Sequence, residues 1–252
     1  MTFKKCDISI IMTAHAEGSL AWASIKSVEE AVEYASDKGI SVEKIFAMDN
    51  PTDETAAIAY ILKDKGWIVS EVSFKDQGKV RNDAVTRANG KYVAFIDADD
   101  LFCFGWLGDA YEFAESFDED VIVHPEFNYF FEGVKSIVCF IDQDSNTFDY
   151  DRLRVANYWD SLSFCKKTIY LDFPFCDREI ARGYAYEDWH WNCVTVAAGI
   201  KHKILYDSVI FKRRQETSQT VLASREKALI PPNAFTDYNQ IEKFLQKQKE
   251  FG

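Results

Sequence analysis

The fold is decided by one stretch of the sequence, Tyr92-Val93-Ala94-Phe95-Ile96-Asp97-Ala98-Asp99-Asp100. Apolar residues followed at once by carboxylates are typical of a buried parallel strand whose carboxyl end meets a polar site. Clustered carboxylates repel one another unless a cation lies between them, and hard oxygen ligands suit Mg²⁺ or Mn²⁺. On spacing alone, an acidic surface turn that caps the next helix explains the motif equally well.

Upstream of this stretch, apolar strands alternate with amphipathic helices. We expect three earlier strands, at residues 8–12, 42–48 and 67–72. Helices are expected between the strands, at 19–38, from 52 or 53 to 65, and at 79–88, because apolar residues recur there at helical spacing. The first part of the chain is therefore predicted to be an open α/β sheet.

Polar residues follow the strands of this predicted sheet. In such sheets ligands bind beyond the carboxyl ends of the strands, so these residues are predicted to meet at one rim rich in carboxylates. They are Thr13, His15 and Glu17, then Asp49, Asn50 and Asp53, and finally Asp97, Asp99 and Asp100.

The second half is less regular. We expect a helix at 105–117, a strand at 121–124, a hairpin formed by 128–131 and 134–141, and a mobile loop at 142–162. Further on, a helix at 189–198, short strands at 203–206 and 209–213, a linker and a charged helix at 238–249 are expected.

Composition excludes several classes of protein. The 252 residues carry 29 Lys and Arg against 41 Asp and Glu, a formal net charge of −12, which disfavours a broad nucleic-acid-binding surface. The six cysteines form no C-x-x-C pair and are expected to be reduced thiols. No stretch approaches the ~18 apolar residues of a membrane span. The apolar run at 8–12 is too short for a signal peptide, so we expect a cytoplasmic location.

Two basic groups are candidates for anion binding. Lys79 and Arg81 open a predicted helix after Gly78, and helix N-termini bind anions, although a solvated basic turn explains them as well. A later basic stretch is able to hold a diphosphate or an anionic membrane surface, or to be a solvated strand edge. It comprises Lys201, His202, Lys203, Lys212, Arg213 and Arg214.

An acidic pair, Glu187-Asp188, precedes Trp189 and an apolar helix. Asp188 in that place is either a helix N-cap or a general base, and the two roles are compatible. Trp189 and Trp191 are able to form a stacking floor for a sugar ring, with core packing as the competing interpretation.

The order of these motifs resembles family 2 glycosyltransferases of the GT-A fold. The similar segments are 7–13 (opening strand), 49–55 (D-G-S-T-D-x-T), 77–82 (Q-G-x-x-x-A-R-N, one spacing residue shorter), 97–100 (D-A-D-D) and 187–189 (E-D before a helix). The resemblance covers about residues 7–218. It implies a GT-A domain at 1–220, with a nucleotide-binding half at about 1–100 and an acceptor half at about 101–220, followed by a linker and helix at 221–252.

The resemblance also implies roles for single residues. Asp188 would be the catalytic base, and Asp99 would ligate Mn²⁺ or Mg²⁺ at the donor diphosphate. The nucleotide-sugar site would comprise Thr13, His15, Glu17, Asp49, Lys79, Arg81, Asp97, Asp99, Glu187 and Trp189. The implied activity is inverting transfer of one sugar from a nucleotide-sugar donor, UDP-linked, to a saccharide or lipid-linked saccharide. Peripheral contact with the inner membrane face is a further hypothesis.

The sequence departs from the family pattern at two places. Met48 replaces the first acid of D-D-G-S, and Gln215 stands where the family often has a histidine metal ligand. The Q-x-x-R-W motif of processive synthases is absent, which favours addition of single sugars. Two alternatives stay open: a DxD-type phosphohydrolase, whose motif usually lies on the first strand, and a non-catalytic sugar-nucleotide-binding module.

Overall fold

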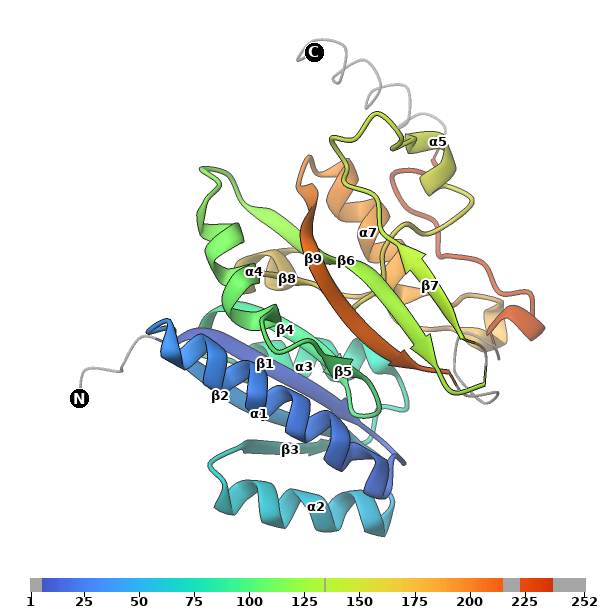
Figure 1. Cartoon of the computed structure of the whole chain (residues 1–252). Coiled ribbons are helices and arrows are strands. Elements are labelled where there is room, and N and C mark those ends of the chain that lie inside the picture. The colour runs from blue at the N-terminus through green and yellow to red at the C-terminus, as the bar shows by residue number, and fades with distance from the viewer. Residues whose placement is uncertain (1–5, 134, 215–222, 238–252) are drawn as a thin grey trace.

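The computed structural model of the chain describes residues 6–133, 135–214 and 223–237. Its centre is a nine-stranded mixed sheet with the order β3-β2-β1-β4-β8-β6-β9-β5, and β7 pairs with β6 beside this path (Figure 1).

The first half of the sheet is parallel, as predicted. Its strands are β1 (Cys6–Ala14), β2 (Val42–Asp49), β3 (Ile68–Val72) and β4 (Gly90–Asp97). The elements between them are η1 (Gly18–Leu20), α1 (Ala21–Asp37), α2 (Asp53–Asp64) and α3 (Gln77–Arg87). Helix α2 begins where the Thr52 side chain accepts a bond from the Thr55 amide, and Asp76 caps α3 in the same way.

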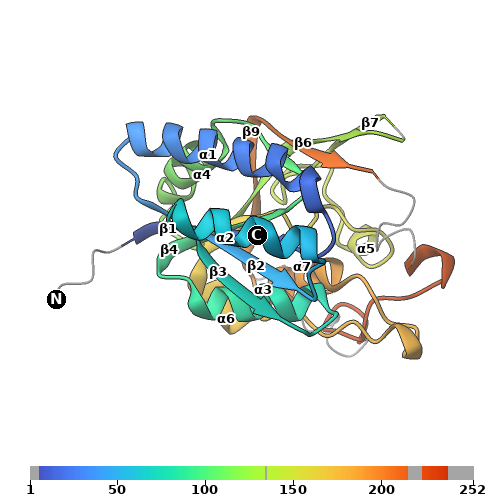
Figure 2. The same cartoon turned by 90° about the horizontal axis from the view of Figure 1, so that it is seen from below.

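Helices cover both faces of this sheet. Figure 2 shows α1 and α4 (Trp106–Glu115) on one face and α3 and α6 (Lys167–Asp172) on the other. Strands β1 and β4 lie at the centre, and nearly all of their residues are buried. This burial on both faces explains why the central strands read as continuous apolar runs.

The second half contains longer strands than the sequence predicted. One strand, β6 (Val121–Phe131), replaces the two expected at 121–124 and 128–131, with a register shift between Pro125 and Phe127. Likewise β9 (Lys201–Arg213) is one strand rather than two, although Asp207 takes a left-handed conformation within it. The hairpin partner is β7 (Ser136–Cys139). Two short strands were not predicted, β5 (Leu101–Phe102) and β8 (Phe164–Lys166).

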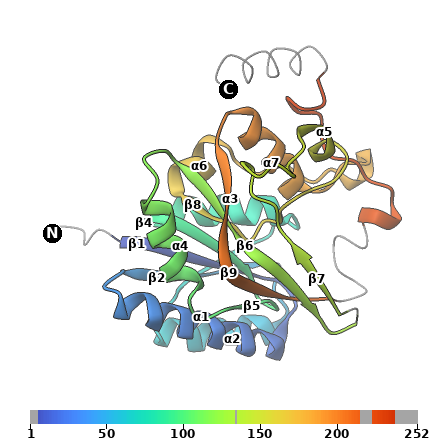
Figure 3. The same ribbon diagram turned by 45° about the horizontal axis from the view of Figure 1, so that its top comes forward.

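The prediction of a mobile loop at 142–162 is wrong, because Leu153, Trp159 and Leu162 from this segment are buried. The segment contains α5 (Tyr150–Leu153) and packs against α7 (Glu187–Ala197), with η2 (Ile180–Arg182) shortly before that helix. Figure 3 shows α5 and α7 at the end of the molecule opposite α1 and α2.

The contacts between the 142–162 segment and α7 form a second hydrophobic core, and the stretch predicted as a linker contributes to it. Phe235 is 2% exposed and packs beside Leu153, Tyr158 and Trp159. The expected helix at 238–249 lies outside the described residues. Within the part of the chain that the structure describes, no helix is long and apolar enough to cross a bilayer.

Candidate active site

The carboxyl ends of β1, β2 and β4 meet at one rim, as predicted, and enclose a cavity of about 670 Å³ that we call the first cavity. Its lining includes Thr13, His15, Glu17, Asp49, Asn50, Gln77, Asp97, Asp99, Asp100, Lys212, Arg213 and Arg214. Residues far apart in the sequence are brought together because parallel strands present their carboxyl ends to the same edge.

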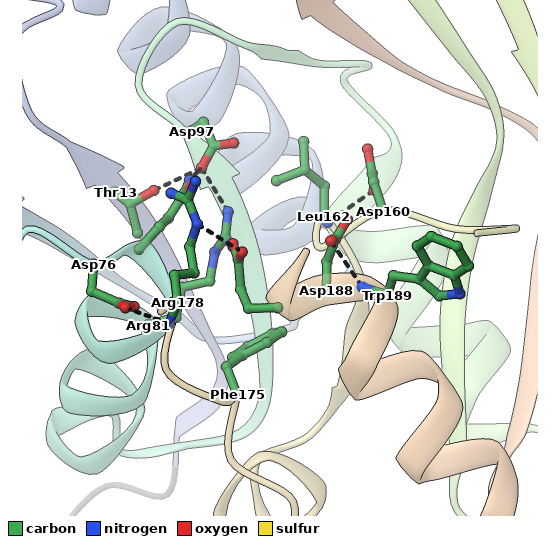
Figure 4. Close-up of polar contacts among 12 residues, drawn as sticks. Thr13, Asp76, Arg81, Asp97, Asp160, Leu162, Phe175, Arg178, Asp188 and Trp189 are labelled. Atoms are coloured by element: carbon green, nitrogen blue, oxygen red, sulfur yellow. Dashed lines mark hydrogen bonds and ion pairs between the residues drawn. The ribbon is translucent and has the colours of Figure 1, made fainter. Parts of the chain in front are cut away.

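Asp97 is fixed by three donors that all reach the same oxygen. Its Oδ1 accepts hydrogen bonds from Thr13 Oγ1 at 2.7 Å, Gln77 Nε2 at 2.7 Å and Arg81 Nη2 at 3.0 Å. Figure 4 shows the second oxygen of Asp97 pointing away from these donors. Burial opposes the charge of Asp97, but the cations Arg81 and Lys212 outweigh it and lower the pKa of this carboxyl. Asp97 is therefore an ionised group with one oxygen available to a ligand.

The other two carboxylates of the motif differ in their partners. Burial and repulsion from Asp97 and Glu17 raise the pKa of Asp99 to about 6. The pKa of Asp100 rises to about 7, mainly through burial, although Lys212 opposes this. Asp100 accepts a bond from the Arg213 amide at 2.8 Å and faces Lys212 Nζ at 3.1 Å. Asp100 is thus paired with groups of the protein itself, whereas the electrostatic repulsion that Asp97 and Glu17 exert on Asp99 favours a bound cation.

Asp49 and His15 organise the loop beside the first cavity. Asp49 Oδ1 accepts bonds from the amides of Phe74 and Lys75, and its Oδ2 accepts one from Asp76. His15 Nδ1 lies 2.6 Å from the Asp49 carbonyl oxygen, and because a carbonyl only accepts, this nitrogen donates the hydrogen bond. Asp49 therefore holds the loop at 74–76, with two of the three bonds on Oδ1 and one on Oδ2.

Glu17 closes the same corner of the first cavity. Its Oε2 accepts a bond from the His15 amide at 2.6 Å. Burial is the main reason why the pKa of Glu17 is raised, with a further contribution from the negative charge of Asp97.

The predicted anion site at the start of α3 is only partly present. Lys79 lies outside the described lining of both cavities and pairs with Asp177 at 3.0 Å. Gln77, two residues earlier, lines the first cavity instead. Gly78 is required because a Cβ there would lie 2.9 Å from the carbonyl oxygen of Cys176. The glycine therefore permits the 175–178 segment to pass against the helix start.

A second cavity of about 280 Å³ adjoins the first and shares Gln77, Asp97, Phe130, Lys212 and Arg214 with it. Its other lining residues include Asn128, Phe140, Asn157, Tyr158, Asp160, Arg178, Tyr186, Glu187 and Asp188. The two cavities thus form one continuous depression with Asp97 and Lys212 at the junction.

A buried ion-pair chain joins the two cavities. Arg81, which is 1% exposed, contacts Asp97 at 3.0 Å and Glu187 Oε1 at 3.3 Å, and Glu187 Oε2 lies 3.5 Å from Arg178 Nε (Figure 4). The guanidinium carbon of Arg81 lies 5.7 Å from the ring centre of Phe175. Arg81 lies at the wall of the second cavity but exposes almost no surface, so we expect it to act through Asp97 and Glu187 rather than by direct contact with a ligand.

Asp188 is the second residue of α7 and not its N-cap, so the N-cap interpretation is wrong. The capping position belongs to Tyr186, in a left-handed conformation with φ 63°. Asp188 Oδ1 accepts a bond from the Trp189 amide at 2.8 Å, and Oδ2 lies 3.4 Å from Asn157 Nδ2. Burial, followed by repulsion from Glu187, raises the pKa of Asp188 to about 7. A carboxylate with this pKa is matched to proton transfer near neutral pH.

The tryptophans of α7 pack within the protein. Trp189 lies outside the described lining of both cavities, and its Nε1 donates to the Leu153 carbonyl at 2.6 Å. Trp191 is 1% exposed and stacks on Tyr170. The core interpretation therefore holds for both side chains.

The basic stretch does not form one patch, because it follows the length of β9. Lys201 and Lys203 pair with Asp144 and Asp142, and His202 is fully buried against His124. Lys212 lies between Asp100 and Asp160, 3.1 and 3.2 Å away, at the junction of the cavities. These acids raise the pKa of Lys212 despite its burial.

The structure places further residues at the site to which the sequence assigned no role, among them Gln77, Asn157, Asp160 and Arg178. Gln77 lies in the 77–82 segment that resembles the family motif, and its position next to Gly78 was the sequence feature that could have pointed to it. The other three lie in segments without periodicity, so the sequence held no signal for them.

Solved structures share this architecture. The crystal structure of S. aureus TarS 1-349 in complex with UDP-GlcNAc matches with a TM-score of 0.65 and 17% identity over 96% of this chain and 66% of that one. The mannosyltransferase PcManGT from Pyrobaculum calidifontis, in complex with GDP-Man and Mn²⁺, matches with a TM-score of 0.59 and 16% identity over 86% and 59%. The chain spans 44% of the longer TarS structure. The fold is thereby that of GT-A glycosyltransferases.

The sequence model of "Glycosyl transferase family 2" matches residues 9–164. The chain therefore belongs to glycosyl transferase family 2. A comparison with curated proteins gave no match.

The described residues fit a divalent cation held largely by substrate. Among residues 6–133, 135–214 and 223–237, no group of three or more His, Cys, Asp and Glu side chains is placed to hold a metal ion. Mg²⁺ and related ions are, however, often bound through one or two carboxylates plus substrate phosphates. The raised pKa of Asp99, caused by burial and by Asp97 and Glu17, is the pattern that such an ion would relieve.

Proposed function

We propose that this protein is an inverting glycosyltransferase that moves a single sugar from a UDP-sugar to a hydroxyl of a saccharide or lipid-linked acceptor. We place it in the synthesis of a cell-surface polysaccharide or glycolipid. The observation that carries the proposal is the position of Asp188. It lines the second cavity, which shares Asp97 with the carboxylate rim of the first.

In this proposal the first cavity binds the donor. The free oxygen of Asp97 binds the ribose or sugar, and His15, Glu17 and Asp49 surround the nucleotide. Asp99 holds Mn²⁺ or Mg²⁺, which when bound offsets negative charge on the diphosphate. Support comes from the solved neighbours, whose complexes contain UDP-GlcNAc, UDP, or GDP-Man with Mn²⁺.

The second cavity binds the acceptor. An alcohol is a poor nucleophile at neutral pH, so ionised Asp188 accepts its proton as attack proceeds. Asn157 and the Trp189 amide hold the carboxylate for this transfer. Lys212, at the junction of the cavities, lies where negative charge on the leaving group develops. Attack from the side opposite the leaving group inverts the anomeric centre without a covalent glycosyl-enzyme.

The decisive experiment combines a donor panel with one substitution. UDP- and GDP-sugars are tested with Mn²⁺ by thermal shift, because ligand binding raises the melting temperature by mass action. Asp188→Asn should then lower turnover of the bound donor, including its hydrolysis, by about 10²- to 10⁴-fold. Donor affinity should stay unchanged. Asp172→Asn, an exposed carboxylate at the end of α6, is the matched control. Wild-type turnover in Asp188→Asn would remove the base assignment.

The two alternatives are tested alongside. A phosphohydrolase would use a motif aspartate as nucleophile, and a trapped phospho-aspartate at Asp97 would support it. The three donors on Asp97 Oδ1 and the family match favour the transferase. A non-catalytic module would bind donors without turnover.

A cytoplasmic location with peripheral contact at the inner membrane face completes the proposal. The ion pairs of Lys201 and Lys203 with Asp142 and Asp144 leave less basic surface for it than the sequence indicated. Flotation with anionic liposomes tests the contact, and absence of co-flotation would contradict it.

A further inference from the structure

Tyr186 is the residue on which the start of α7 depends. Its backbone is left-handed, with φ 63° and ψ 56°, directly before Glu187-Asp188. This conformation is unfavourable for any residue with a Cβ and persists where the surroundings enforce it. The Tyr186 carbonyl accepts the bond from the His190 amide at 3.0 Å, so Tyr186 also sets the first turn that carries Asp188.

The surroundings that enforce this turn come from residues 223–237, which we call the C-terminal strap. The Tyr186 hydroxyl lies 3.1 Å from Ser224 Oγ. The Ala185 amide donates to the Leu229 carbonyl at 2.9 Å, and the Leu229 amide donates to the Gly183 carbonyl at 2.8 Å. The strap therefore holds the turn by its backbone at one point and by a side chain at another.

The strap is itself anchored in the second core and reaches the second cavity. Phe235 is 2% exposed, and its ring stacks on Tyr150 with centroids 6.3 Å apart. At the other end, Ala223 packs against Ala185 and lines the second cavity together with Tyr186. Because the strap is fixed at both ends, a displacement of the strap would also displace the N-terminus of α7, to which it is hydrogen-bonded.

We propose that the C-terminal strap positions the general base: through Ser224 and Leu229 it holds Tyr186 in its left-handed turn and so aims the Asp188 carboxylate into the second cavity. Tyr186 and Ser224 are positioning residues in this arrangement. The inference rests on the proposed function, in that Asp188 is taken as the base. Asp188 lies two residues after Tyr186, in the first turn of α7, so the backbone angles of Tyr186 set the direction in which that turn begins.

The test uses the full chain with UDP-GlcNAc or GDP-mannose and Mn²⁺ as probes. Ser224→Ala and Tyr186→Phe each remove the hydroxyl pair, and Ser224→Thr keeps it. Tyr206→Phe is the matched control, since Tyr206 is 64% exposed on β9. Hydrolysis of the bound donor, its affinity by calorimetry, and hydrogen exchange of the 187–190 amides are measured.

We expect kcat for hydrolysis to fall about fivefold in Ser224→Ala and Tyr186→Phe, the factor that one neutral hydrogen bond is worth. Donor affinity should stay within about twofold, and the 187–190 amides should exchange faster. Ser224→Thr should restore both readouts. Phe235→Ala, which loosens the anchor without touching the cavity, should reproduce the effect, whereas Phe104→Ala, 65% exposed, should not.

Wild-type hydrolysis in both hydroxyl variants, with faster exchange, would overturn the positioning role. Wild-type exchange at 187–190 would overturn the claim that the strap holds the turn. A wild-type protein that binds neither probe, or an Asp188→Asn variant that hydrolyses normally, would instead refute the proposed function. In that case the exchange data alone would decide whether the strap holds Tyr186.

Discussion

Replacement of Arg81 by glutamine tests the buried ion-pair chain most directly. The guanidinium contacts Asp97 at 3.0 Å and Glu187 at 3.3 Å and is almost inaccessible to water. Removing one partner of a buried pair costs about 3–5 kcal/mol, because the remaining charge stays desolvated. The Asp97 side chain is 23% exposed and Glu187 keeps Arg178, so both retain some compensation. We therefore expect a loss near the lower limit, about 3 kcal/mol.

Urea denaturation measures this loss. With a slope of about 3 kcal/mol per molar, expected for a chain of this size, the midpoint should fall by about 1 M. Arg87→Gln is the matched control. Arg87 lies on the same helix and pairs with Asp83 at the surface, where such pairs contribute less than about 0.5 kcal/mol. Arg81→Lys keeps the charge with fewer donors and should fall between the two.

The loss should also depend on pH. The lowered pKa of Asp97 contributes stability above the pKa of the unfolded carboxyl, and this stability is lost as pH falls through the folded pKa. Without Arg81, burial raises the pKa of the uncompensated carboxylates, which take up protons on acidification. The deficit should therefore be largest near pH 8 and shrink towards about pH 5. A deficit below about 1 kcal/mol, or one independent of pH, would refute the reasoning.

Further predictions concern pH and packing. Asp188 acts as a base in its ionised form, and its pKa is about 7. The value of kcat/KM for donor hydrolysis should therefore rise from about pH 5.5 and level off above about pH 8. A flat pH profile would contradict this role. The pKa values of Asp99 and Asp100 are raised to about 6 and about 7, so ionisation of these two carboxyls opposes folding. In calorimetry without nucleotide, the melting temperature should therefore rise as the pH falls from about 8 to about 6. Addition of Mn²⁺ with UDP should weaken that dependence, and an unaltered slope would count against a cation at Asp99. In Gly90→Ala the new Cβ would lie 2.4 Å from the Ser9 amide nitrogen, so urea denaturation should show a loss of at least about 2 kcal/mol. Gly105→Ala should lose less, because its Cβ would lie 2.5 Å from the end of the Asp109 side chain, which can shift, and only at ordinary contact distance from Tyr34.

The parallel half of the sheet was predictable because each element carries its own signal. Strands buried on both faces read as apolar runs, and helices α2 and α3 have caps at Thr52 and Asp76. The convergence of strand ends then followed from the geometry of parallel sheets. For this reason the acidic rim could be predicted before any coordinates were known.

The second half was predicted less well for identifiable reasons. The gap predicted within β6 coincides with the register shift after Pro125, and the gap predicted within β9 coincides with the left-handed residue Asp207. Strand β8 has three residues and is defined only by its partners β4 and β6. The contacts of Arg81 with Asp97 and Glu187, and of Tyr186 with Ser224, join residues far apart in sequence, so no local pattern announces them.

The crowding of three donors on one oxygen of Asp97 has a consequence for its replacement. An asparagine at this position would satisfy Thr13, Gln77 and Arg81 with its carbonyl oxygen and turn its amide towards the cavity. Such a variant would keep the three hydrogen bonds, but the first cavity would lose a negative charge and buried Arg81 would lose one of its two counter-charges. The charge of Asp97, rather than its hydrogen-bonding capacity, is therefore what distinguishes aspartate from asparagine at this position, because Arg81 and Lys212 both interact with that charge.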